Sequence, residues 1–194
     1  MAIVLAGTFK LYPEILNMIS NKIVIDRFYS PLGEILLGDY QGRLCLCDWA
    51  LSTHRIMVDR RIRQRLDAEI EKGRTELTIK AAVQLDGYFS QQRINFDLPL
   101  LFCGTFFQSE VWRYLMMVPY GTTKSYGDLS RDVRRPKAVR AVANAVGANA
   151  LAIIVPCHRI VGVSGALGGY SGGTLVKRSL LLMEKQRSLC GYGH

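Results

Sequence analysis

Short apolar runs alternate with polar residues over residues 27–49, which read RFYSPLGEILLGDYQGRLCLCDW. Turn-favouring segments interrupt the runs at Pro31-Leu32-Gly33 and at Gln41-Gly42. Alternation with a period of two places successive side chains on opposite faces of a strand. This part of the chain therefore predicts two or three short β-strands.

Apolar residues at helical spacing dominate the rest of the chain. One predicted helix covers residues 59–72, with Ile62, Leu66 and Ile70 on its apolar face. The other predicted helices cover residues 78–89, 107–117, 126–133, 136–147 and 174–187, and the segment at residues 97–105 is a candidate linker. We therefore expect an α+β protein with a small mixed α/β domain at residues 1–103 and a helical domain at residues 104–194.

The charge of the chain divides at the same place. Residues 1–103 carry 13 basic and 12 acidic side chains, and residues 104–194 carry 12 and 4, so +8 of the formal net charge of +9 lies in the second half. Such asymmetry favours a polyanionic partner, although a solvated basic surface explains the same numbers. The densest basic segment is RDVRRPKAVR at residues 131–140.

Residues 136–147, PKAVRAVANAVG, predict a helix that begins near Pro136 and stops at Gly147. At about 100° per residue, one stripe that we expect to face the core consists of Val139, Val142 and Val146. The opposite face is basic and built of small side chains, namely Lys137, Arg140, Ala141 and Asn144. With the preceding short helix and the Arg134-Arg135-Pro136 turn, it predicts the second helix of a helix-turn-helix, an arrangement that many purely structural helix pairs share.

Cys157 and His158 stand side by side in IIVPCHRIV, residues 153–161. A cysteine after an apolar strand is usually an inert buried thiol. Here Pro156 is expected to end the strand, and His158 and Arg159 supply a base and a positive charge that favour the nucleophilic thiolate. Neighbouring side chains of an extended chain diverge, so a water molecule would bridge the thiol and the imidazole. The second half has four acids, Glu110, Asp128, Asp132 and Glu184, and Glu184 is the one outside the presumed DNA-reading region, so it is the candidate partner of the base.

The cysteines and the apolar runs exclude several classes of protein. Five cysteines are an odd set and the first ten residues contain no basic leader, so we expect reduced thiols in a cytoplasmic protein, or in a nuclear one if the source is eukaryotic. No apolar run reaches the roughly 18 residues of a membrane span, so no membrane partner is expected. Cys45 and Cys47, with His54 nearby, fit no usual zinc spacing; we interpret them as structural thiols and expect no metal.

Four segments within residues 119–184 together resemble the methylated-DNA–protein-cysteine methyltransferases, also called O6-alkylguanine-DNA alkyltransferases. They are PYGTTKSYGDLSRDV, PKAVRAVANAVGAN, VPCHRIVGVSGALGGYSGG and KRSLLLME. The first half is similar more loosely, in SPLGEILLGDYQGRLCLCDW and QLDGYFSQQRINFDLPL. The resemblance implies a ribonuclease-H-like N-terminal domain and a C-terminal helix-turn-helix domain.

The resemblance further implies direct-reversal DNA repair. The alkyl group of O6-alkylguanine in double-stranded DNA would pass irreversibly to Cys157, with O4-alkylthymine as a second candidate substrate. The protein would be a single-turnover methyltransferase without a cofactor, and a monomer is the simplest expectation. Because the target atom lies inside the base stack, the nucleotide has to be flipped out.

Individual roles are also implied by the resemblance. In catalysis, Cys157 would accept the alkyl group, His158 would be its water-mediated base, and Glu184 would be the carboxylate that orients the imidazole. Asn149 would brace the active-site turn. Tyr126 would rotate the nucleotide and hydrogen-bond the leaving guanine. The DNA-binding residues would be Arg140, which fills the vacated place in the stack, with Tyr126, Arg135, Lys137, Ala141 and Asn144; Ala138 and Ala145 would also fit the groove. The substrate pocket would be lined by Ile160, Tyr170, Ser171 and Lys177.

Other interpretations stay open on the sequence. A Cys-His hydrolase would use the same residue types but would turn over, and a transcription factor would bind selected sequences without needing Cys157. Alkyltransferase-like lesion-binding proteins typically lack the cysteine that this chain has. Many family members carry prolines after the asparagine, where this chain has Asn149-Ala150-Leu151-Ala152, which leaves its tolerance for bulky alkyl groups open.

Overall fold

The computed structural model describes residues 21–189, and its first half is built on a mixed four-stranded sheet. The strands β1 (Lys22–Ser30), β2 (Gly33–Tyr40) and β3 (Arg43–Trp49) form an antiparallel meander, and β4 (Glu69–Lys72) pairs parallel to β1, giving the order β3-β2-β1-β4. The three strands predicted from alternation and the α+β class are confirmed. The leader prediction for the first ten residues, and Cys190, lie outside the described residues.

The predicted helix at residues 59–72 is wrong in its second part. The helix α2 covers Arg55–Leu66 and ends where Asp67 takes a left-handed conformation, with φ of 46°. Asp tolerates this conformation better than most residues. Ile70, expected on the helix, lies instead on β4, where the backbone gains hydrogen-bond partners along β1. The acidic and basic side chains of this edge strand are exposed, which suits a strand that ends a sheet.

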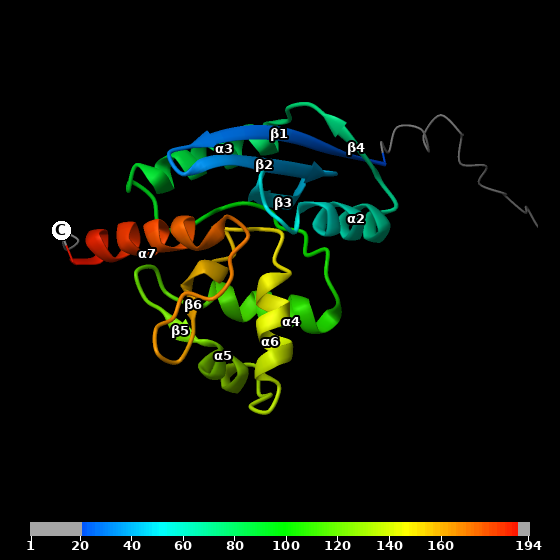
Figure 1. The fold of residues 1–194 in the computed structure, drawn as a ribbon. Coiled ribbons are helices and arrows are strands. Elements are labelled where there is room, and N and C mark those ends of the chain that lie inside the picture. Colours follow the sequence, from blue (N-terminus) through cyan, green and yellow to red (C-terminus); the bar gives the residue numbers. More distant parts are fainter. Residues whose placement is uncertain (1–20, 190–194) are drawn as a thin grey trace, which may run out of the picture.

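The helix α3 (Glu76–Phe89) covers one face of the sheet, as Figure 1 shows. Its start is set by a capping box, in which the Thr75 side chain accepts from the Thr78 backbone N–H and the Thr78 side chain accepts from that of Thr75. Its inner face buries Ala81, Leu85 and Tyr88. The helix predicted at residues 78–89 is therefore confirmed.

The second half is mainly helical, lies below the sheet in Figure 1, and shares a hydrophobic core with α3 and the sheet. Its elements are α4 (Phe106–Met116), β5 (Lys124–Ser125), α5 (Tyr126–Asp132), α6 (Val139–Gly147), the 3₁₀ helix η1 (Cys157–Arg159), β6 (Ile160–Val161) and α7 (Gly173–Leu189). The short strands β5 and β6 pair in parallel. All four predicted helices of this half are present, within a few residues of their expected ends.

The helix α6 begins three residues later than predicted, and its buried face differs. Arg134 has φ of 56°, and Pro136 lies in the turn before the helix rather than in its first turn. Val142 is buried as expected, but Val139 is 39% exposed. Ala145, expected to face a groove, is buried instead, and its carbonyl accepts a hydrogen bond from Trp112 Nε1 at 2.8 Å. Val139 is the first residue of the helix, and the buried face of α6 consists of Val142, Ala145 and Val146.

One hydrophobic core joins the two halves. It contains Leu37 and Trp49 from the sheet together with Trp112, Leu115 and Ile153 from the second half. The candidate linker also packs tightly, since the Leu44 N–H donates to the Pro99 carbonyl at 2.8 Å and Leu101 N–H donates to the Leu44 carbonyl at 2.9 Å. The sheet therefore reaches the segment that precedes Cys157.

Candidate active site

Cys157 is presented by a tightly wound segment and not by the end of a strand. Residues 150–156 form turns, with Ile153 at φ of 70°, and a single bridge joins Leu151 to Cys47 of β3. A buried β-branched residue in that conformation is strained, so the surrounding contacts must hold it. The strand predicted before Pro156 is therefore wrong, because the segment pairs with β3 at only one point.

Asn149 fixes the geometry of this segment around the thiol. Its Nδ2 donates to the Val155 carbonyl at 2.9 Å and to Cys157 Sγ at 3.2 Å, while its Oδ1 accepts from the Leu151 N–H at 3.0 Å. Cys157 is 7% exposed and Asn149 4%. One side chain thus closes the turn and donates a hydrogen bond to the sulfur.

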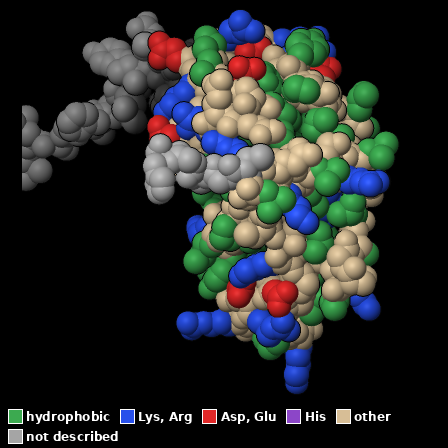
Figure 2. All heavy atoms as spheres, turned by 90° about the vertical axis from the view of Figure 1, so that its left-hand side faces the viewer, with side chains coloured by type: hydrophobic (Ala, Val, Ile, Leu, Met, Phe, Trp, Pro, Cys, Tyr) green, Lys and Arg blue, Asp and Glu red, His purple; other side chains and the backbone are tan. Residues whose placement is uncertain are grey.

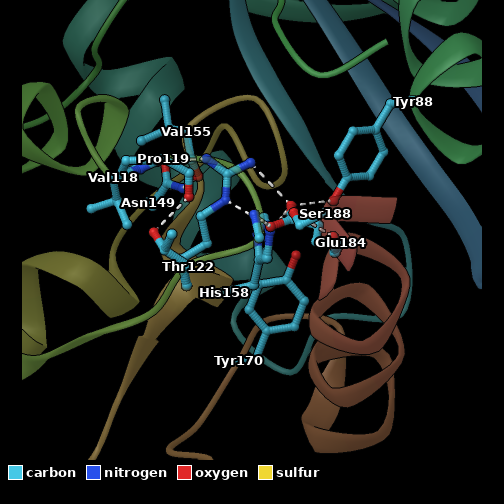
Figure 3. A network of polar contacts seen from close by, with 12 residues as sticks. Tyr88, Val118, Pro119, Thr122, Asn149, Val155, His158, Tyr170, Glu184 and Ser188 are labelled. Atoms are coloured by element: carbon cyan, nitrogen blue, oxygen red, sulfur yellow. Dashed lines mark hydrogen bonds and ion pairs between the residues drawn. The ribbon is translucent and has the colours of Figure 1, made fainter. Parts of the chain in front are cut away.

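His158 lies fully buried between this turn and α7, with its ring facing Glu184 (Figure 3). Its Nε2 is 2.8 Å from Glu184 Oε1, whereas its Nδ1 has no hydrogen-bond partner within residues 21–189. A carboxylate can only accept, so Nε2 carries the proton and Nδ1 keeps a free lone pair. That lone pair is the group able to receive a proton from the thiol, directly or through a water.

The Glu184 carboxylate is surrounded by donors from three parts of the chain. Oε1 accepts from His158 Nε2, from the Tyr88 hydroxyl at 2.7 Å and from Arg159 Nη2 at 3.0 Å, and Oε2 accepts from Arg159 Nε at 2.9 Å and the Gly121 N–H at 3.1 Å. Figure 3 shows Tyr88 and His158 pointing toward Glu184 from different sides. A fully buried carboxylate with this many donors is held in one orientation.

The protonation states follow from burial and from these contacts. Burial would raise the pKa of Glu184, but the hydrogen bonds and charges of His158 and Arg159 outweigh it and lower the pKa to about 2. Burial lowers the pKa of His158, against the opposing effect of Glu184, so Arg159 is the cation that balances the carboxylate at neutral pH. Burial raises the pKa of Cys157 to about 11, partly opposed by the Asn149 hydrogen bond.

The expectation that neighbouring His158 and Arg159 keep the sulfur ionised therefore fails for the free protein. Both side chains turn toward Glu184, and burial favours the neutral thiol of Cys157. The resting pair is a neutral thiol and a neutral imidazole with an open Nδ1. Ionisation of the thiol requires transfer of its proton to this base.

A cavity of about 780 Å³ opens next to these residues. Tyr126, Asn144, Tyr170 and Ser171 line it from the second half, so four of the predicted site residues are brought together there. Cys157 is not among the residues that line this cavity. Burial raises the pKa of Tyr126 and Tyr170, and the negative charge of a Cys157 thiolate would raise the pKa of both further.

Lys177 and Ile160, predicted to line the pocket, lie behind it instead. Both are fully buried, and Lys177 Nζ donates to the Ile160 carbonyl at 2.6 Å. Burial lowers the pKa of Lys177, and the proximity of Cys157 opposes this shift. Lys177 therefore braces β6, the strand that follows Cys157 and Arg159.

The first half supplies part of the site, which the sequence did not predict. Trp49 Nε1 lies 3.2 Å from the Tyr170 hydroxyl, and a Cβ on Gly172 would lie 2.7 Å from the same nitrogen, so only glycine fits there. Arg61 of α2 donates to the Ala148 carbonyl at 2.6 Å and lines the cavity. These side chains, like Tyr88, follow ordinary core or helix patterns in the sequence, so no local signal marks them.

The residues predicted to contact DNA lie on one exposed surface of the second half. Those exposed are Arg135, Lys137, Arg140, Ala141 and Asn144. A hollow of about 560 Å³ is lined by Tyr126, Lys137, Val139, Arg140 and Ala143. Figure 2 shows Lys and Arg side chains projecting from the end of the molecule at which Figure 1 places α5.

Arg135 is restrained more than its neighbours on this surface. Its guanidinium lies 5.5 Å from the centroid of the Phe107 ring, and its Nη2 is 3.7 Å from Glu110 Oε2. The residue is still exposed, so these contacts orient the Arg135 guanidinium without burying it.

Residues 21–189 show neither a metal-binding cluster nor a membrane-spanning helix. No group of three or more His, Cys, Asp or Glu side chains in this range is arranged to hold a metal ion. No helix in this range combines the length and apolarity needed to cross a bilayer. Cys45 and Cys47 are buried, and their thiols lie near the carbonyls of Gly38 at 3.4 Å and Ala152 at 3.3 Å.

Comparison of the sequence with known proteins identifies the family of this chain. Residues 106–186 match the model of the 6-O-methylguanine DNA methyltransferase DNA-binding domain. A methylated-DNA–protein-cysteine methyltransferase of Methanosarcina acetivorans is 40% identical over 158 residues, which cover 81% of this chain and 95% of the relative. The chain belongs to the methylated-DNA–protein-cysteine methyltransferase family.

Other members of the methylated-DNA–protein-cysteine methyltransferase family match a shorter part of the chain at higher identity. The inducible enzyme of Bacillus subtilis is 49% identical over 107 residues, covering 55% of this chain, and the match spans only 60% of that relative's length. A crystal structure of Mycobacterium tuberculosis OGT in complex with DNA superposes with a TM-score of 0.71 at 37% identity, covering 86% of this chain and 94% of the other. The α+β fold is thus shared with a family member over nearly its whole length.

Proposed function

We propose that this protein repairs O6-alkylguanine in double-stranded DNA by transferring the alkyl group to Cys157. The observation that carries the proposal is the chain of contacts behind the thiol, in which Glu184 fixes His158 so that the free Nδ1 can act as base. Family membership supports the same chemistry, since the relatives are named for methyl transfer from DNA to a protein cysteine. OGT of Mycobacterium tuberculosis was crystallised with DNA.

The transfer is a single displacement at carbon. His158 takes the proton of Cys157, the resulting thiolate attacks the alkyl carbon, and the bond between that carbon and O6 breaks with its electron pair moving to the guanine. The guanine takes up a proton from solvent, which balances the thiol proton held by His158, and it stays in the DNA as an unmodified base. The sulfur keeps the alkyl group as a thioether. Tyr126, whose pKa burial raises, stays protonated and can donate a hydrogen bond to the leaving guanine. Because no step removes the thioether, each molecule acts once.

DNA binding is assigned to α5 and α6, which we propose to act as a helix-turn-helix with α6 in the minor groove. The exposed face of α6 carries Arg140, Ala141 and Asn144, so it is narrow and basic. Phosphate contacts and a degenerate minor-groove pattern give affinity for any duplex, which a lesion-searching protein requires. Arg140, beside Tyr126 at the hollow, is assigned to the place that the flipped nucleotide leaves.

The finer assignments of the two halves belong to the same proposal. We assign residues 1–103 to a ribonuclease-H-like domain and residues 104–194 to the DNA-binding and acceptor domain, with Tyr170 and Ser171 lining the base pocket. O4-alkylthymine is the second candidate substrate, because its exocyclic oxygen carries the alkyl group in the same way. The protein is proposed to act as a monomer.

The decisive experiment follows the alkyl group. The protein is incubated with duplex DNA that carries a labelled methyl group on guanine O6, and the labelled peptide is located by mass spectrometry. We expect one equivalent of label on Cys157 and none in the Cys157→Ala variant. Product beyond one equivalent would indicate a turning-over hydrolase, and unlabelled protein with unchanged DNA affinity would indicate a binding protein.

A further inference from the structure

Tyr88 connects the first half of the chain to the carboxylate behind the nucleophile. It lies on α3 and is fully buried, and its hydroxyl donates to Glu184 Oε1 at 2.7 Å. Figure 3 shows its hydroxyl reaching Glu184 from the side of the sheet, opposite Tyr170. The same carboxylate oxygen accepts a hydrogen bond from His158 Nε2 at 2.8 Å. A residue of the first half and the proposed base therefore donate to one oxygen atom.

The ring of Tyr88 has little freedom to leave this position. Its centroid lies 5.4 Å from that of Phe89, 5.7 Å from that of Phe96 and 6.1 Å from that of Tyr120. Burial raises the pKa of Tyr88 well above its usual value, and the negative charge of Glu184 raises it further. The hydroxyl therefore keeps its proton and acts as a fixed donor to the carboxylate.

We propose that Tyr88 is a positioning residue, through which the first half of the chain sets the strength of the His158–Glu184 hydrogen bond and thereby the pH range in which His158 serves as base. This inference rests on the proposed function of Cys157. It extends that function because the first half of the chain would influence the rate of alkyl transfer through the Tyr88 hydroxyl.

The physical reason is competition between donors at one oxygen. Tyr88, His158 and Arg159 all donate to Oε1, and each donor withdraws some of the negative charge that the others feel. Removing the phenol hydroxyl leaves more charge on Oε1 facing the imidazole. A carboxylate that carries more charge favours the imidazolium form of His158, because an opposite charge in contact stabilises the charged state.

Several other charged and titratable groups surround this pair. They are Arg159 of η1, Tyr120 of the loop before β5, Lys177 and Arg187 of α7, and Cys157 and Tyr170 beside the imidazole. The hydrogen bond that Tyr88→Phe removes is the one to Glu184 Oε1, so we expect a change in the variant to come from that contact.

The test compares the wild type with Tyr88→Phe, which keeps the packed ring and removes the hydroxyl. The rate of methyl transfer to Cys157 is measured against pH by quantifying the labelled peptide, and alkylation of the same thiol by iodoacetamide is measured in parallel without DNA. We expect the acidic limb of both profiles to move to higher pH by about 0.5 to 1 unit in Tyr88→Phe. A parallel drop in rate at every pH, with the limb in place, would show that Tyr88 only supports packing and would overturn the inference.

Two further variants separate the possible causes. Tyr40→Phe removes a hydroxyl that donates to Asn21 Oδ1 at 2.8 Å, far from the site, and its profile should match the wild type. In a Glu184→Gln background the additional Tyr88→Phe change should no longer move the limb, because the shared charge is gone. A shift that persists there would also overturn the inference. Failure of the wild type to accept methyl from DNA would instead refute the proposed function, while the iodoacetamide profiles would still report on Tyr88.

Discussion

The substitution Glu184→Gln removes the charge on which the buried contacts of the site converge, while keeping the size of the side chain. Arg159 loses a carboxylate that it contacts with two nitrogens, at 2.9 and 3.0 Å, and its guanidinium stays buried. The amide of glutamine can replace at most one acceptor oxygen, and its NH₂ group faces donors. The variant should therefore be both less stable and slower in methyl transfer.

Two independent routes give the size of the stability loss. Breaking a buried ion pair by neutralising one partner costs about 3–5 kcal/mol. The pKa of Glu184 falls from its usual 4.5 to about 2, and at about 1.4 kcal/mol per unit this corresponds to roughly 3 kcal/mol of folding stability. Because the folded-state pKa is the lower one, this stability is present above pH 4.5 and is lost as the pH falls toward 2.

Urea unfolding at neutral pH and at decreasing pH tests the reasoning, with Glu110→Gln as the matched control. Glu110 contacts Arg135 at 3.7 Å on a partly exposed surface, so its neutralisation should cost less than about 1 kcal/mol. Glu184→Gln should lose about 3 kcal/mol at neutral pH and lack the acid-dependent loss of the wild type. Methyl transfer should slow by at least about tenfold, since the imidazole becomes less basic. Equal stability losses for the two variants would refute the assignment of Glu184 as the buried charge of the site.

Three other substitutions test separate features. Arg140→Ala should reduce repair of duplex DNA by about tenfold or more while sparing the reaction with free O6-alkylguanine base, and equal losses on both substrates would contradict a role in flipping. Asn149→Ala removes the hydrogen bond to the sulfur and should raise the pKa of the thiol further, so iodoacetamide should alkylate Cys157 more slowly at a given alkaline pH; unchanged kinetics would show that the 3.2 Å contact does not affect the thiol. Gly121→Ala should cost clearly more in urea unfolding than Gly42→Ala, since both glycines have φ near 75° but only Gly121 packs against α7; equal costs would refute the close approach.

Local patterns in the sequence determined much of the fold. The alternation in residues 27–49 and the helical spacing in the second half correspond to elements found in the structure. The errors occurred where tertiary contacts decide, as at Ile70, which pairs into the sheet, and in residues 150–156, where a single bridge to Cys47 replaces a strand. Such pairings join residues far apart in the chain, so no window of the sequence contains them.

The candidate site shows the same division. Cys157, His158 and Glu184 could be assembled from residue types and from the family resemblance, and the structure brings the last two into contact. Tyr88 and Trp49 could not be assigned to the site from the sequence, because their contacts with Glu184 and Tyr170 depend on how the first half packs against the second. The protonation state of the thiol also depends on burial, which adjacency in the sequence does not reveal.

The core shared by both halves has a consequence for how this protein tolerates change. Since Leu37 and Trp49 pack in the same cluster as Trp112 and Ile153, the sheet and the acceptor turn should melt in one cooperative transition. A destabilising substitution in a strand would then unfold the turn that carries Cys157 without changing Cys157 itself. Substitutions in the sheet would therefore reduce the fraction of molecules in which Cys157, His158 and Glu184 are assembled, even though all three residues were unchanged.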